Sequence, residues 1–261
     1  DLGSEVSFSE YRDDDQRLQD ARDNALEEYR EFVQKCHDND IKVCFDFVIN
    51  HGGRHHPFFQ DTIESKGSVP DGPVDYKTVE SWNTSSKYFD WFDRLDEPNT
   101  LDDGTQIEAT PGATYFAGFL PLPEWNYSNV ALREHILAAA DFWSGDVGVD
   151  GFRCDIAYGG PHDFWKEVRD VVRANDKEFM MLDETIPYER SFSENEFDIH
   201  YDKTRLRDGT VAVAQGNLPF QRLVDRKRER DLVGIPDHTL LLNFTENHDE
   251  QRLFKIARNG G

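Results

Sequence analysis

The chain has few cysteines, no long apolar run and no apolar leader. Its three cysteines, Cys36, Cys44 and Cys154, show no C-x-x-C spacing, which argues against a metal or redox motif and against a disulfide scaffold. No segment approaches the roughly 20 consecutive apolar residues of a membrane helix. The first residues are polar and acidic, unlike the basic flank and apolar core of a signal peptide. We therefore expect a soluble chain without a signal peptide, and its compartment, cytoplasmic or secreted, stays open.

Basic residues are also scarce, since 29 Lys and Arg stand against 52 Asp and Glu, giving a net charge of -23. Such a surface repels nucleic acids and anionic membranes, so neither is expected as a partner. The low lysine content and acidic excess resemble proteins of salt-adapted organisms, in which salt screens the repulsion between carboxylates. With 261 residues the chain can bury a sizeable core, and we expect one main domain of unknown oligomeric state.

The order of elements predicts an α/β fold. Apolar residues recur every three or four positions over 15–37, which indicates an amphipathic helix, and the apolar run 41–47 is typical of a buried parallel strand. Further helices are expected over 130–143 and 161–173 and within 210–230, and further strands over 149–154, 179–182 and 239–244. This alternation fits a closed barrel or an open doubly wound sheet. The lack of a G-x-G-x-x-G loop after any strand favours the barrel.

Carboxylates, histidines and an arginine follow four of the predicted strands. The segments are DFVINH (46–51), GFRCD (151–155), LDE (182–184) and FTENHD (244–249). The carboxyl ends of barrel strands are where such folds build active sites, whereas strand ends without a function carry mostly small turn residues. Cys154 alternates with Arg153 and Asp155 along its strand, so we expect its side chain to face the other way and pack in the core.

These four segments resemble the conserved regions of the α-amylase family, glycoside hydrolase family 13, in order and in spacing, and LPEWN (122–126) resembles the motif near the end of the family's domain B. The resemblance spans nearly the whole chain and implies a (β/α)8 TIM-type barrel. Residues 1–51 and 125–261 would form the barrel, and 52–124 would form an inserted domain B after the third strand. Because the first region lies on the family's third strand, we expect a truncated barrel without its first two strands and its last one.

The resemblance implies that Asp155 is the nucleophile, Glu184 the general acid/base and Asp249 the carboxylate that stabilises the transition state. Retaining hydrolysis needs an ionised carboxylate and a protonated carboxyl roughly 5–5.5 Å apart. Arg153, on the same strand face as Asp155, would keep that carboxylate ionised. Glu184 would need a raised pKa, which we expect from repulsion by neighbouring carboxylates.

Further site residues follow from the same resemblance. His51, His248 and Arg153 would bind substrate, and Asp46 would support Arg153. Asn50 matches a calcium ligand of many members, so calcium is a candidate ion, although the chemistry requires no cofactor. Many members carry Lys-His where this chain has Tyr158-Gly159-Gly160, which weakens the expectation of calcium and of the usual acceptor contacts. Five aromatic residues could either stack on sugar rings or form the core of the insertion: Trp82, Tyr88, Trp91, Tyr115 and Trp125.

The expected activity is retaining hydrolysis of α-1,4-glucosidic bonds in starch, maltodextrins or related α-glucans. Two alternatives stay open. One is a transglycosylase of the same family, because partition between water and a sugar acceptor depends on the shape of the acceptor site. The other is a catalytically silent carbohydrate-binding or interaction module. Silent relatives typically lose the nucleophile or the acid, and this chain has both Asp155 and Glu184.

Overall fold

A computed structural model describes residues 15–66, 79–95, 99–100, 106–107, 112–114, 122–185, 192, 194–228, 235 and 239–259. Its centre is a five-stranded parallel sheet in which strands that follow one another in the chain lie side by side. The strands are β1 (Cys44–Asp46), β8 (Gly151–Cys154), β9 (Met180–Asp183), β10 (Ile199–Tyr201) and β11 (Leu240–Leu242). Such an order is that of a barrel wall, because a doubly wound sheet reverses direction at a switch point. The predicted barrel-type fold is confirmed.

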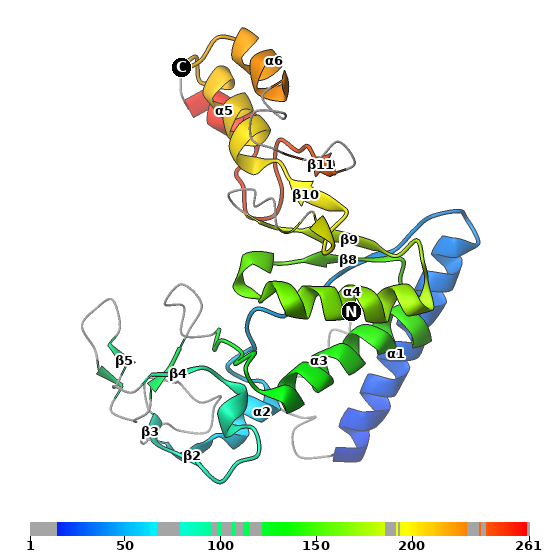
Figure 1. Cartoon of the computed structure of the whole chain (residues 1–261), viewed down its shortest axis with the longest axis vertical. Coiled ribbons are helices and arrows are strands. Elements are labelled where there is room, and N and C mark those ends of the chain that lie inside the picture. The colour runs from blue at the N-terminus through cyan, green and yellow to red at the C-terminus, as the bar shows by residue number, and fades with distance from the viewer. Residues whose placement is uncertain are drawn as a thin grey trace.

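Three helices pack around the first strands of this sheet: α1 (Asp15–His37), α3 (Val130–Asp141) and α4 (His162–Asn175) (Figure 1). The ring of Tyr29 on α1 contacts those of Phe45 on β1 and Trp143 after α3. Helix α4 buries one face because its apolar residues recur at helical spacing; these are Phe164, Trp165, Val168 and Val172. The cysteine of β8, Cys154, is a fully buried free thiol in this core, as predicted.

The segment between β1 and α3 forms a separate lobe, visible at the lower left of Figure 1. Its elements are α2 (Pro57–Asp61), β2 (Ile63–Lys66), β3 (Val79–Trp82), β4 (Arg94–Leu95), β5 (Asn99–Thr100), β6 (Gln106–Ile107) and β7 (Gly112–Ala113). The strands form the antiparallel pairs β2–β3, β4–β7 and β5–β6. Trp82 and Trp91 are buried with Phe59 and Phe92, so these two tryptophans are core residues. Tyr88 and Trp125 are partly buried, and Tyr115 lies outside the described residues.

The C-terminal third adds α5 (Asp208–Ala214), α6 (Gln221–Arg228) and α7 (Leu253–Asn259), which lie beyond β10 and β11 at the top of Figure 1. One prediction for this third was wrong, and one strand was missed. The single helix expected within 210–230 is two helices, separated by a turn in which Gly216 has a φ of +77°, a conformation that favours glycine. Strand β10 was not predicted, because Ile199-His200-Tyr201 carries a histidine in its middle and shows no apolar run. Within the described residues, no helix is both long and apolar enough to cross a membrane.

Candidate active site

The parallel register of the sheet brings the polar strand ends together. Asp46 on β1 lies opposite Arg153 on β8, and Cys154 lies opposite Asp183 on β9. The backbone N–H of Glu184 donates to the carbonyl of Cys154 at 3.0 Å, so strand pairing continues up to Glu184. Two segments far apart in sequence therefore present Arg153 and Glu184 at one edge of the sheet.

Arg153 donates hydrogen bonds to several side chains at this edge of the sheet. Its guanidinium is 10% exposed, and Nη1 donates to both carboxylate oxygens of Asp46 at 2.9 and 3.1 Å and to Oδ1 of Asp155 at 2.5 Å. Nη2 donates to the carboxylate of Glu184, and Nε donates to the hydroxyl of Tyr201 at 3.3 Å. One buried cation thus holds three carboxyl groups, Asp46, Asp155 and Glu184, at one edge of the sheet.

Glu184 differs from its neighbours in protonation. Its side chain is 13% exposed, and burial, more than any other cause, raises its pKa from 4.5 to about 7. A hydrogen bond with Asp155 and the charges of Asp155 and Asp249 act in the same direction, while Arg153 opposes them. The expected rise is present, but its main cause is desolvation rather than the predicted repulsion. A carboxyl that holds its proton near neutral pH beside carboxylates is suited to general acid catalysis.

The backbone turns sharply after Asp155. Ile156 has φ 48° and ψ 49°, in the left-handed region, which is costly for a β-branched residue. The next residue, Ala157, donates its N–H to the carbonyl of Glu184 at 3.3 Å, so this turn is tied to the end of β9. Strained backbone of this kind concentrates at functional sites. Sequence reasoning missed Ile156, because nothing in its neighbours marks a positive φ.

The remaining predicted residues lie around this centre at different distances from it. His51 has a pKa lowered by burial, and the charge of Asp155 partly offsets this, so the two side chains are within electrostatic reach. Asp249 and His248 lie on the loop after β11, where their side chains are 57% and 63% exposed and 3.0 Å apart. Asp249 acts on the pKa of Glu184 but has no bond to Arg153 among the described contacts. The structure thus brings the predicted residues at the ends of β1, β8 and β9 together, whereas Asp249 and His248 after β11 lie exposed at the edge of the site.

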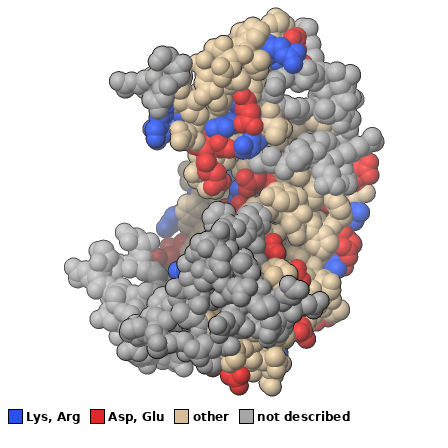
Figure 2. All heavy atoms as spheres, turned by 90° about the vertical axis from the view of Figure 1, so that its left-hand side faces the viewer, with Lys and Arg blue, Asp and Glu red and all other residues tan. Residues whose placement is uncertain are grey.

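One face of the molecule is hollowed. Figure 2 shows acidic and basic side chains gathered along the hollow, between the C-terminal helices and the lobe that follows β1. Glu250, which follows Asp249 in the sequence, pairs with Lys203 at 2.9 Å and with Arg207 at 2.6 Å. These ion pairs tie the exposed β11 loop to the segment after β10.

Sequence reasoning also missed two groups that belong to the unpredicted strand β10. Tyr201 accepts the hydrogen bond from Nε of Arg153 and lies under its guanidinium, 5.7 Å from cation to ring centroid. His200 points to the opposite face, where it contacts Asp183, and both side chains are fully buried. Burial raises the pKa of Asp183 despite this histidine. Finding these residues required locating β10.

Asn50, the expected calcium ligand, has a closely packed side chain. Calcium takes six to eight oxygen ligands. The described residues contain no group of three or more His, Cys, Asp or Glu side chains able to hold a metal. The amide oxygen of Asn50 is packed against Gly159 so tightly that a Cβ there would lie 1.5 Å from it, and the amide nitrogen lies 3.3 Å from Nδ1 of His51. The described residues around Asn50 thus pack closely on one another.

Comparisons with known proteins agree with the fold. The family model described as the α-amylase catalytic domain matches residues 24–261. The chain is 32% identical over 228 residues to the α-amylase MalA of Haloarcula japonica, covering 86% of this chain and 29% of that protein. It is 31% identical over 235 residues to a cyclomaltodextrinase of Thermoanaerobacter pseudethanolicus, covering 87% and 36%. The chain spans about a third of the length of these relatives.

Solved structures show the same likeness. A cyclomaltodextrinase superposes with a TM-score of 0.71 at 26% identity, covering 89% of this chain and 36% of that one. The cyclic α-maltosyl-(1→6)-maltose hydrolase of Arthrobacter globiformis superposes with a TM-score of 0.72 at 23% identity, covering 89% and 48%. At that identity the second likeness concerns the fold alone.

Proposed function

The chain belongs to the α-amylase family, whose catalytic-domain model covers it from residue 24 onward, and on this premise we propose that it carries the centre of a retaining glycoside hydrolase acting on α-glucans. One observation carries the proposal: Arg153 holds Asp155 and Glu184 at the same guanidinium, while Glu184 has a pKa of about 7. A carboxyl that holds its proton near neutral pH, beside a second carboxyl group, is the arrangement that retaining glycoside hydrolysis uses.

The first step forms a covalent intermediate. The carboxylate of Asp155 attacks the anomeric carbon, the bond from that carbon to the glycosidic oxygen breaks, and Glu184 transfers its proton to the departing oxygen. Arg153 contributes by donating a hydrogen bond to Oδ1 of Asp155 at 2.5 Å, which places a positive charge beside the attacking group. The result is a glycosyl ester on Asp155 and an ionised Glu184.

The second step returns the enzyme to its starting state. Glu184 takes a proton from water, the water oxygen attacks the anomeric carbon from the opposite face, and the ester bond to Asp155 breaks. Two inversions give net retention. In this scheme Asp249 stabilises the positive charge of the transition state, and His51 and His248 hold sugar hydroxyls. Residues 52–124 would correspond to the domain B of the family.

Release of reducing ends from soluble starch and maltoheptaose tests the proposal. The unmutated chain should release them, and a Glu184→Gln variant should be at least about a hundredfold slower, which is typical for the loss of a general acid. Chromatography of the products separates hydrolysis from transfer, because a transglycosylase gives longer oligosaccharides from maltoheptaose. Equal release by the two chains would refute the role of Glu184, and no release by the unmutated chain would refute the proposed activity.

A further inference from the structure

A buried pair of titratable side chains lies on the face of the sheet opposite the proposed centre. Asp183 on β9 and His200 on β10 face each other across the two strands, and Oδ2 of Asp183 and Nδ1 of His200 share a hydrogen bond. Both side chains are fully buried. Burying a carboxyl is costly even when it is paired, and the proposed chemistry uses neither residue.

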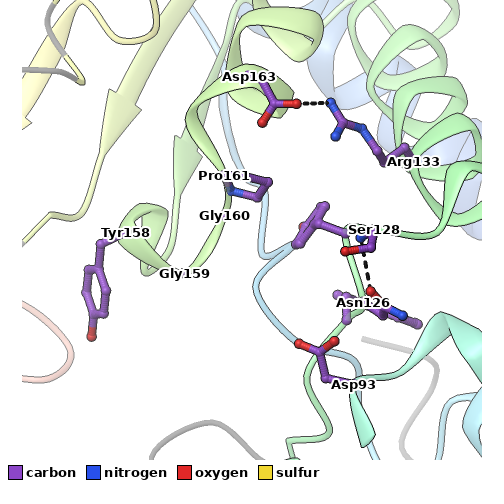
Figure 3. Close-up of a pocket in the computed structure, with 11 residues that line it drawn as sticks. Asp93, Asn126, Ser128, Arg133, Tyr158, Gly159, Gly160, Pro161 and Asp163 are labelled. Carbon is purple, nitrogen blue, oxygen red and sulfur yellow. Dashed lines mark hydrogen bonds and ion pairs between the residues drawn. The ribbon is translucent and has the colours of Figure 1, made fainter.

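The pair is enclosed by core residues. On the β8 side, the fully buried thiol of Cys154 lies opposite Asp183 in the strand register. The ring of Phe197 lies 6.4 Å from that of His200 and 5.0 Å from that of Trp165 on α4, centroid to centroid. Neither Asp183 nor His200 lines the cavity of about 540 Å³ at the turn before α4 (Figure 3). The pair therefore does not meet a substrate, and any effect on the reaction passes through its neighbours.

Each member of the pair precedes a residue of the site. Asp183 is followed by Glu184. His200 is followed by Tyr201. Because side chains alternate along a strand, these two neighbours turn to the opposite face, where Arg153 donates to the carboxylate of Glu184 and to the hydroxyl of Tyr201. The ends of β9 and β10 are thus tied together on both faces of the sheet.

The tie on the buried face matters because the backbone pairing of these strands is short. The register of β9 with β10 includes two residue pairs in the part of the chain that the structure describes, Leu182 with Ile199 and Asp183 with His200. A hydrogen bond has a preferred direction, whereas apolar contact has none. The bond between the two side chains therefore fixes how the strand ends lie against each other.

We propose that Asp183 and His200 are positioning residues, which hold Glu184 and Arg153 in place for the reaction by fastening β9 to β10 from the buried face of the sheet. The inference rests on the proposed function for the reaction that is helped. Loss of the pair should lower kcat with little change in KM, because neither residue touches the sugar. It should also let water reach Glu184, whose pKa is raised mainly by burial, and so lower that pKa.

The test replaces the pair with Asp183→Ala and His200→Phe together, an apolar pair of similar total volume. Buried ion pairs often tolerate such replacement without loss of stability, so this double variant is expected to fold. Its kcat on maltoheptaose should fall at least about tenfold, as expected when reacting groups are slightly misplaced. The titration midpoint of Glu184 should fall by about one unit from near 7. This midpoint is followed by NMR of isotope-labelled glutamate carboxyls and assigned with Glu184→Gln.

Two further variants separate positioning from stability. Asp183→Asn keeps an oxygen that can accept from His200, and it should lower the midpoint of Glu184 by a smaller amount than the double variant does. Glu196→Gln is the matched control, because Glu196 is also a buried carboxyl paired with a histidine, 2.9 Å from Nδ1 of His162. It does not adjoin a residue of the site, so kcat and the midpoint should stay unchanged whatever its effect on stability.

The outcomes separate this inference from the proposed function. An unchanged kcat and midpoint in the double variant would overturn the positioning role, and so would an equal fall of the midpoint in Glu196→Gln. If the double variant does not fold, Asp183→Asn replaces it, and an unchanged midpoint there would overturn the role. A lowered midpoint, together with no release of reducing ends by the unmutated chain, would retain the positioning of Glu184 and refute the activity.

Discussion

Replacing Glu184 with glutamine is expected to stabilise the fold at neutral and alkaline pH. The folded state raises the pKa of Glu184 from 4.5 to about 7, so between these values the folded chain keeps a proton that the unfolded chain releases. Stability therefore falls as pH rises through this window, and the full cost is present above about pH 7. At about 1.4 kcal/mol for each pKa unit, that cost is roughly 3 kcal/mol. Glutamine carries no charge at any pH, so the variant does not have this cost.

Urea unfolding of the two chains at pH 4.5 and at pH 8 measures this effect. The gain in unfolding free energy of Glu184→Gln should be near zero at pH 4.5 and reach roughly 3 kcal/mol at pH 8 as an upper value. Glu134→Gln, on an exposed position of α3, serves as the control and should change little at either pH. A gain that is equal at both pH values, or a loss at pH 8, would refute the claim that burial holds the proton on Glu184.

Four further outcomes are expected. The rate of starch hydrolysis at low substrate should fall with a midpoint near pH 7 as Glu184 loses its proton, and a plateau extending to pH 9 would contradict its role as the acid. Gly159→Ala should cost about 1–3 kcal/mol of unfolding free energy because its Cβ would meet Asn50. Gly53→Ala, with open space around it, should cost little. Equal costs of the two substitutions in urea unfolding would contradict the close packing of Gly159. Tyr201→Phe should cost about 1 kcal/mol in the same assay, since it removes the hydrogen bond from Nε of Arg153, and no loss would show that water replaces the hydroxyl. The unfolding temperature should rise between dilute buffer and about 1 M salt, because salt screens the repulsion between acidic groups in a chain of net charge -23. An unfolding temperature that does not change with salt would refute the claim that this repulsion destabilises the folded chain.

Much of the barrel could be predicted from the sequence because its first strands are continuous apolar runs. Strands β1, β8 and β9 and helices α1, α3 and α4 lie where periodicity and capping residues indicate them. Asn129, for example, caps α3 by accepting the N–H of Leu132 at 3.1 Å, as side chains of its type do at helix starts. Strand β10 escaped prediction because its central histidine is buried by pairing with a carboxylate on the neighbouring strand, a contact between distant residues.

The sequence predicted which residues contribute to the site better than it predicted the causes of their pKa shifts. The pairing of Asp46 with Arg153 was implied by the family resemblance, and the structure places the two side chains in contact. The pKa of Glu184 depends mainly on burial by segments distant in sequence, which the local motif does not contain. The same is true of Tyr201, which reaches Arg153 only because β10 lies next to β9.

The most direct test of the account is to trap the covalent intermediate on Asp155. The Glu184→Gln variant is incubated with α-maltosyl fluoride, whose leaving group needs no general acid, and the intact protein is then analysed by mass spectrometry and peptide mapping. We predict an added maltosyl group on the peptide that contains Asp155, and none in a variant that also carries Asp155→Asn. Turnover of the fluoride with inverted configuration, or an adduct on another residue, would contradict the assignment of Asp155 as the nucleophile of a retaining enzyme.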